Sequence, residues 1–416
     1  MRVPGFSPID PSGIGPSGRT KFPRDVPVLA LIAFCVMLGF GVVAPIIPVY
    51  ASTFGVSEFA ASAVISAFAL MRLVASPFLG RVVDKLGPRT VLAIGMGIVA
   101  VSSALAGLSQ SYLQLLLLRG IGGVGSAMFS ISAMTLLLGA VGPELRGRAS
   151  AFFNSGFLIG SISGPALGGV FSAISMSAPF FFYAGTLALA GIVGLALLSK
   201  PKPTTAGDDE AAPTQALRDV VRDRRFQAAC LINLANGWSA SGMRSAMLPL
   251  FVAATMYSIP AEAARWTGIA MACSALLQAV VINPAGAAVD RFGRRLPMIA
   301  GSLLAAASVM AIPFTSSIIP LIVVLCFNAV ATAILGSAPA ATVGDVAGPN
   351  GSRAIAVFSM CSDVGSIAGP LACGALASMV SYQAAFATGA ILWLASALVA
   401  STISRHFGDG GGGGIG

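Results

Sequence analysis

Charged residues are scarce in this chain. Only 9% of its 416 residues are charged, against roughly 25% in an ordinary soluble domain, and this scarcity excludes a water-soluble globule. The single histidine, His406, lies near the C-terminus, which excludes histidine relays and catalytic metals held by histidine. The six cysteines form no CxxC pair, and no GxxxxGKS/T loop occurs. These absences exclude a disulfide framework, a metal centre and an ATP-hydrolysing motor.

Hydrophobic residues are abundant instead. They make up 56% of the chain and gather in stretches of about 20 residues, the length that crosses a hydrocarbon core roughly 30 Å thick as a helix. We therefore predict an all-α membrane protein with twelve transmembrane helices. These helices are predicted over residues 26–50, 59–80, 90–110, 112–140, 148–173, 178–198, 226–254, 263–286, 296–314, 317–344, 352–379 and 383–404.

The longest polar interruption divides these helices six and six. We predict a disordered cytoplasmic leader (1–25), an N-terminal six-helix bundle (26–198), a cytoplasmic linker (199–225), a C-terminal six-helix bundle (226–404) and a glycine-rich tail (405–416).

The formal net charge of +9 is explained by where the cations lie. If both termini are cytoplasmic, all lysines and arginines at helix ends or in loops fall on the cytoplasmic side except Arg265. This is the positive-inside distribution of membrane proteins. It predicts a protein integral to the plasma membrane, with the lipid bilayer rather than a nucleic acid as its partner.

Two segments of the chain occur twice. The sequence GRVVDKLGPR at 80–89 recurs as GAAVDRFGRR at 286–295. An Arg-Ala pair at Arg148 precedes Gly164-Pro165 by sixteen residues, and the same spacing separates Arg353 from Gly369-Pro370. These offsets predict a tandem repeat of one six-helix unit, which is typical of many transporters.

The charged repeat resembles the GxLaDRxGRR pattern of the major facilitator superfamily. The resemblance covers nearly the entire chain and implies two six-helix bundles around a central cavity, with alternating access. It also implies a gating role for the charged residues of both copies, because a carboxylate is favoured at the positive end of a helix dipole. These gating residues are Asp84, Arg89, Asp290, Arg294 and Arg295.

The fifth predicted helix carries a glycine-rich pattern. Gly160, Gly164, Pro165, Gly168 and Gly169 match the gxxxGPxxGG motif that the same family associates with antiporters. Such residues supply no reactive side chain, but they leave a smooth groove for a neighbouring helix. The resemblance therefore implies export, while the residues alone predict close helix packing.

Two further stretches resemble the family. Arg119 precedes a glycine-rich stretch of the fourth helix, similar to a family motif whose arginine is linked to proton coupling. That stretch, 120–125, also satisfies GxGxxG, but a dinucleotide site needs a strand before it and a soluble βαβ unit around it. The segment LGFGVVAPIIPVY at 38–50 resembles the drug:proton antiporters, and its Pro45 is predicted to help line the cavity.

Asp363 is the one acid predicted deep within a helix. It lies about eleven residues after the predicted start, or roughly 16 Å along the axis, close to the bilayer midplane. A carboxyl group there is a candidate proton carrier; the alternative is an aspartate that stays neutral or pairs with an arginine. Further polar residues within helices are weak candidates for the substrate path, namely Arg72, Asn233, Asn236, Trp238 and Arg244.

The charges inside the helices also constrain the substrate. Arg72, Arg119 and Arg244 against Asp363 give a formal charge of 3 − 1 = +2 in this region, which favours neutral, zwitterionic or weakly anionic molecules. We predict a monomeric secondary transporter, not an enzyme, that exports a small amphiphilic drug-like molecule or metabolite against a proton. No metal or organic cofactor is expected, and the proton is the co-substrate.

Two alternatives stay open at this point. One is another transport mode of the same family, either uptake by symport or export of one defined metabolite. The more distant alternative is a membrane-embedded enzyme or a lipid-flipping scaffold, although an enzyme needs clustered histidine, aspartate or serine at the membrane interface.

Overall fold

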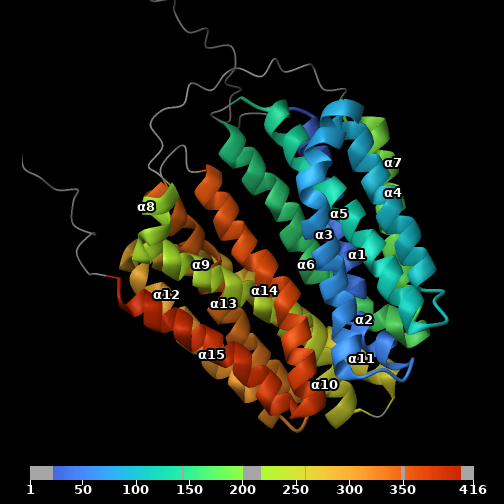
Figure 1. Cartoon of the computed structure of the whole chain (residues 1–416), viewed down its shortest axis with the longest axis vertical. Helices are drawn as coiled ribbons and strands as arrows, with labels where there is room; N and C mark the ends of the chain where they lie inside the picture. Colours follow the sequence, from blue (N-terminus) through green and yellow to red (C-terminus); the bar gives the residue numbers. More distant parts are fainter. Residues whose placement is uncertain (1–21, 143–144, 200–216, 258, 348–351, 404–416) are drawn as a thin grey trace, which may run out of the picture.

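The chain is entirely helical where its structure is described. The computed structural model describes residues 22–142, 145–199, 217–257, 259–347 and 352–403, and every regular element in these ranges is a helix (Figure 1). The predicted all-α fold is confirmed. Most of the predicted leader and all of the predicted tail lie outside the described residues.

Twelve helical segments, besides the short helix α8 (Leu217–Arg222), follow one another in the described part of the chain. The first six, here called the N-half, are α1 (Asp25–Val43) with α2 (Ile47–Ser52), α3 (Glu58–Leu86), α4 (Pro88–Ala106), α5 (Tyr112–Ala140), α6 (Arg146–Ile174) and α7 (Ala178–Leu197). The last six, here called the C-half, are α9 (Arg224–Gly237) with η3 (Trp238–Met247) and α10 (Leu248–Thr255), α11 (Pro260–Phe292), α12 (Arg295–Ala311) with η4 (Ile312–Phe314), α13 (Ile318–Ala347), α14 (Ser352–Met379) and α15 (Tyr382–Ser401). The helix α8 lies between the halves in sequence.

The two halves meet at one end and diverge toward the other. In Figure 1 their ribbons come together near α2 and α10 and separate toward α8. We call the end that carries α8 the linker end, and the end that carries α2 and α10 the far end. Ten helices among the described residues are long and apolar enough to cross a membrane. The other two segments are α6, which is rich in glycine and serine, and α9–α10, which is interrupted by the π-helix η3.

The repeated charged segment has the same backbone in both copies. Gly87, between α3 and α4, has φ +80°, and Gly293, between α11 and α12, has φ +72°. Glycine adopts such angles without steric cost, which explains its place in both repeats. Just after each turn an arginine donates a hydrogen bond to a carbonyl at the end of the last helix of its own half: Arg89 to Leu195, and Arg295 to Ser401.

The first and seventh segments depart from a regular α-helix. The first predicted helix breaks after Val43 and resumes at Ile47, and Pro45 lies buried in the intervening turn. The seventh contains the π-helix η3, in which the Ser245 hydroxyl donates to the Ala240 carbonyl oxygen, five residues earlier, at 2.9 Å. Sequence periodicity does not signal the π-helix, which is a rare conformation often found at functional sites.

Glycines bring α6 directly against the backbone of α1. A Cβ atom added to Gly160 would lie 2.7 Å from the Phe34 carbonyl oxygen, and one added to Gly164 would lie 2.6 Å from the Gly41 Cα atom. Gly168 would approach the Val42 carbonyl oxygen to 2.5 Å. The antiporter-like motif therefore holds the N-half together, because nothing larger than hydrogen fits between the two helices.

This packing predicts the effect of filling the groove. Gly164→Leu should destabilise the N-half by about 1–3 kcal/mol or more, because the added side chain meets backbone that cannot rotate away. The loss is measured as a lower midpoint temperature in a thermal unfolding assay of the detergent-solubilised protein. The matched control is Gly185→Leu in α7, where an added Cβ atom meets nothing within 4 Å. Equal stability of the two variants would contradict the packing role.

Candidate functional site

One contact region between the halves joins α3 to α14. Near the far end, a Cβ atom on Gly374 would lie 2.9 Å from both the Glu58 carbonyl oxygen and the Phe59 Cα atom. The Glu58 side chain is also an electrostatic neighbour of Tyr382. Further along, the Ser66 hydroxyl donates to the Ile367 carbonyl oxygen at 2.8 Å. We call this region the α3/α14 seam.

The second contact region, the α6/α11 seam, is built from small residues. A Cβ atom on Gly268 of α11 would lie 2.6 Å from the Pro165 carbonyl oxygen, and one on Gly169 would lie 2.9 Å from the Arg265 carbonyl oxygen. Both contacts lie near the start of α11 and the end of α6, which is the far end. Pro165 and Gly169 of the antiporter-like motif thus reach the opposite half, whereas its other glycines pack within the N-half.

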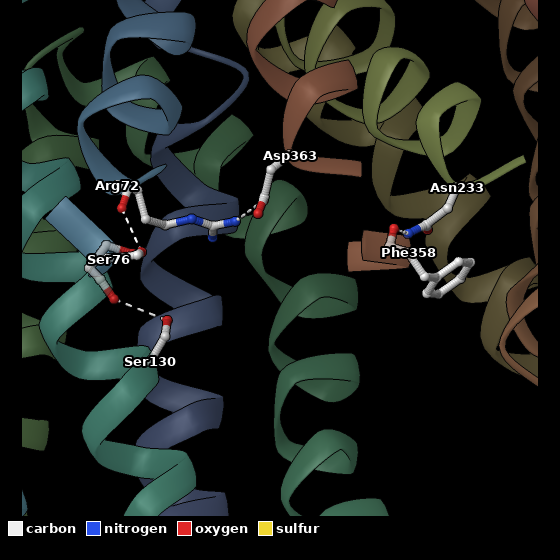
Figure 2. Close-up of polar contacts among 7 residues, drawn as sticks. Arg72, Ser76, Ser130, Asn233, Phe358 and Asp363 are labelled. Atoms are coloured by element: carbon white, nitrogen blue, oxygen red, sulfur yellow. Dashed lines mark hydrogen bonds and ion pairs between the residues drawn. The ribbon is translucent and has the colours of Figure 1, made fainter. Parts of the chain in front are cut away.

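An ion pair lies in the α3/α14 seam beyond the Ser66 bond, toward the linker end. The Nη2 atom of Arg72 is 2.7 Å from the Oδ1 atom of Asp363, and the two side chains are 41% and 32% exposed. Figure 2 shows the two side chains extending toward each other from opposite halves. The sequence predicts Asp363 as a proton carrier and Arg72 only as a weak candidate for the substrate path. The structure brings these two residues together.

Arg119 lies elsewhere, inside the N-half. Its side chain is almost fully buried at 2% exposure, with the guanidinium carbon 4.6 Å from the centre of the Phe68 ring and Tyr183 as an electrostatic neighbour. This arrangement supplies a cation–π contact. The structure does not bring Arg119 into contact with Asp363, whose ion pair is with Arg72. A role of Arg119 in proton coupling stays a prediction.

The candidates on the seventh segment have different surroundings. The Asn233 side-chain amide donates to the Phe358 carbonyl oxygen at 2.7 Å, which joins α9 to α14 (Figure 2). Trp238 starts the π-helix, and its indole nitrogen lies next to Cys373. Asn236 and Arg244 are half-buried. The Asn233 bond is a contact within the C-half, while a substrate contact by any of these residues stays a prediction.

The gating candidates lie at the linker end. Asp84 is exposed in the last turn of α3 and forms no hydrogen bond or ion pair with the described residues. Arg89 and Arg295 bond within their own halves, as described above. Arg294 lies at the start of α12, and Asp290 lies in the last turns of α11 with its side chain outside the described part. In this conformation the far end is closed and Asp84 is not engaged.

Because Asp84 forms no bond with the described residues in this conformation, removing its charge should affect only the opposite conformation. Asp84→Asn should leave the present conformation unchanged and destabilise the opposite one, in which the linker ends close, by about 0.3–2 kcal/mol. The population should therefore shift toward the linker-end-open state. Thiol labelling of single cysteines introduced at the two ends measures this shift. Labelling rates equal to those of the unsubstituted protein, with normal transport, would reduce Asp84 to a topology signal.

The ion pair alters the balance of charges inside the helices. Arg72 and Asp363 neutralise each other, which leaves Arg119 over an aromatic ring and Arg244 half-buried. Two charged groups on opposite halves of a membrane protein thus form one neutral unit only when the halves are in contact. The pair therefore depends on how far apart the halves are.

Comparison with known proteins agrees with this architecture. The family model of the Major Facilitator Superfamily matches residues 29–264 and again residues 241–406. This chain belongs to the major facilitator superfamily. The resemblance seen in the charged repeat is confirmed.

Relatives of known sequence include drug-resistance proteins. The quinolone resistance protein NorA of Staphylococcus aureus is 31% identical over 202 residues, which are 47% of this chain and 51% of NorA. The match therefore spans about half the length of that relative. Multidrug resistance protein 1 of Bacillus subtilis is 26% identical over 371 residues, covering 87% of this chain and 92% of that protein.

Solved structures of the superfamily share the fold. A bacterial homologue of the human lysosomal transporter Spinster, in an inward-facing and occupied conformation, has a TM-score of 0.72 at 14% identity and covers 90% of this chain and 95% of its own. The nucleoside transporter NupG has a TM-score of 0.72 at 16% identity, with 91% and 98% covered. At these identities the likeness supports the fold alone.

Sequence reasoning missed several residues of the seams between the two halves. Gly268, Ser66 and Gly374 form direct contacts between the halves, yet none lies in a segment that resembles a family motif strongly. Gly374 alone had a signal, because it occupies in the second repeat the place that Gly169 occupies in the first. Ser66 is one of many serines in apolar helices, and its bond to a carbonyl oxygen 301 residues away has no local signature.

Proposed function

We propose that this major facilitator transporter is a proton-coupled antiporter that exports small amphiphilic molecules across the plasma membrane. Both termini and the linker end face the cytoplasm in this proposal, because the linker end carries the excess of lysine and arginine. The drug-resistance relatives and the antiporter-like motif of α6 support export. The one observation that carries proton coupling is the Arg72–Asp363 ion pair between the halves.

The pair suggests how a proton could drive the cycle. In the conformation described, the far end is closed and Asp363 has Arg72 as its counterion. Opening of the far end separates α3 from α14, so that Asp363 loses that counterion. An isolated carboxylate near the bilayer midplane is strongly unfavourable, so Asp363 then takes up a proton from the outside. When the α3/α14 seam closes again, Arg72 restores the pair and the proton leaves toward the cytoplasm.

Proton movement in vesicles tests this proposal. Everted vesicles that contain the protein are given an acid interior, and candidate amphiphiles are added outside. An antiporter moves each substrate inward and releases protons, so the preset gradient should collapse only with transported compounds. Vesicles without the protein are the control. Accumulation of substrate by right-side-out cells, with no proton release from everted vesicles, would instead support uptake by symport.

A further inference from the structure

The Arg72–Asp363 pair uses only part of its bonding capacity. One contact of 2.7 Å joins Nη2 to Oδ1. The Nε and Nη1 atoms of Arg72 and the Oδ2 atom of Asp363 have no hydrogen-bond partner among the described residues. These atoms are accessible, because the two side chains are 41% and 32% exposed. The free donors and acceptor of this pair, together with its partial exposure, leave room for a ligand with polar groups of both signs.

The surroundings of the pair combine polar and apolar groups. Ser76 lies one turn after Arg72 on α3, and its hydroxyl donates to the Arg72 carbonyl oxygen at 2.7 Å. Ser130 is exposed on α5, the helix that packs against α3. On the other side, Met360 lies one turn before Asp363 and is 53% exposed. Such a mixture suits an amphiphile, whose head can bind the charges while its apolar body contacts the methionine.

We propose that Arg72 and Asp363 form the head-group site for a zwitterionic amphiphile, a class that deepens the proposed transport function and rests on it. The anionic group of the substrate binds the guanidinium of Arg72, and its cationic group binds the carboxylate of Asp363. The substrate thereby becomes the counterion of both residues, and the direct bond between Arg72 and Asp363 is broken. Its apolar part lies against Met360.

Charge balance separates this substrate class from its rivals. A purely cationic amphiphile would bind Asp363 and leave Arg72 without a counterion, whereas a purely anionic one would leave Asp363 unpaired. A neutral amphiphile would have to compete with the ion pair itself. Only a molecule with both charges leaves no isolated charge at this depth in the membrane, where such a charge is strongly unfavourable.

The same exchange connects binding to movement. The direct pair holds α3 of the N-half against α14 of the C-half. A substrate inserted between the two side chains breaks that direct contact and holds them further apart. Occupancy therefore removes one of the bonds that keep the α3/α14 seam closed, and it favours opening of the far end.

The test is a binding measurement without any proton gradient. The purified protein in lipid nanodiscs is titrated with four matched probes of equal chain length: α-aminodecanoic acid, decylamine, decanoic acid and decanamide. The unsubstituted protein should bind the zwitterionic amino acid roughly tenfold or more tighter than each of the other three, since two charge-assisted hydrogen bonds replace one or none.

Single substitutions should change the preference rather than abolish binding. Arg72→Gln should favour decylamine, because Asp363 keeps its charge, and Asp363→Asn should favour decanoic acid, because Arg72 keeps its charge. The reversed pair, Arg72→Asp with Asp363→Arg, should restore the preference for the amino acid. Arg265→Gln, an exposed arginine at the far end, is the control and should leave the order of affinities unchanged.

Two results would overturn the inference. One is equal affinity of the unsubstituted protein for all four head groups. The other is an equal loss of affinity for all four probes in both single variants, which would indicate a structural pair only. The binding measurement and the vesicle assay can fail separately. Proton release in vesicles without head-group discrimination in binding refutes this site alone. Head-group discrimination without proton release refutes the antiport proposal alone.

Discussion

Asp363→Asn is expected to reduce gradient-driven transport to the level of vesicles that lack the protein. The asparagine keeps the size of the side chain and can still accept a hydrogen bond from Arg72, but it cannot bind or release a proton near neutral pH. If the Arg72–Asp363 pair couples the cycle to protons, the variant should still exchange substrate for substrate at saturating concentration. Radiolabelled exchange and gradient-driven uptake, measured in the same everted vesicles, separate these two activities.

The same chemical change elsewhere provides the control. Asp223 precedes α9 outside the membrane-spanning segments, where its Oδ1 atom accepts a hydrogen bond from the Arg225 backbone N–H at 2.7 Å. Asparagine is an equally good residue at such a helix start, so Asp223→Asn should transport normally. Undiminished gradient-driven transport by Asp363→Asn would remove Asp363 from the coupling mechanism and leave Arg72 as its structural counterion.

Gly268→Leu is expected to block transport while each half of the protein stays folded. An added Cβ atom at this position would lie 2.6 Å from the Pro165 carbonyl oxygen in the opposite half. A leucine side chain therefore keeps α11 and α6 apart and destabilises the far-end-closed conformation by about 1–3 kcal/mol or more. The population should move toward the far-end-open state, which is measured as faster labelling of a cysteine placed at the far end.

Gly286 provides the matched control on the same helix. An added Cβ atom there meets nothing within 4 Å, so Gly286→Leu should keep both the thermal stability and the labelling pattern of the unsubstituted protein. The contact at Gly268 lies between the halves, whereas that at Gly164 lies within one half. For this reason Gly268→Leu should lower the unfolding midpoint less than Gly164→Leu does. A correctly folded Gly268→Leu protein with normal transport would show that the α6/α11 seam does not need close contact.

The fold followed from the sequence because the membrane leaves few choices. In hydrocarbon every backbone N–H and C=O group must be satisfied internally, so each long apolar stretch has to be a helix. The repeat at 80–89 and 286–295 could also be recognised from the sequence. The turn in each copy needs a positive φ, which glycine adopts freely. The helix-five motif predicted close packing for the same kind of local reason, because four-residue spacing places its glycines on one face.

The sequence by itself therefore determined the helices, their repeat, the family and the position of Asp363 within a helix. Only the tertiary structure decided that Arg72 is its partner. These residues are 291 positions apart and belong to different halves, and their contact depends on how α3 and α14 tilt, rotate and slide when the halves dock. Helical periodicity fixes the face on which a side chain lies within its own helix. It contains no information on which face of which distant helix will lie opposite, because that is set by the packing of the whole assembly.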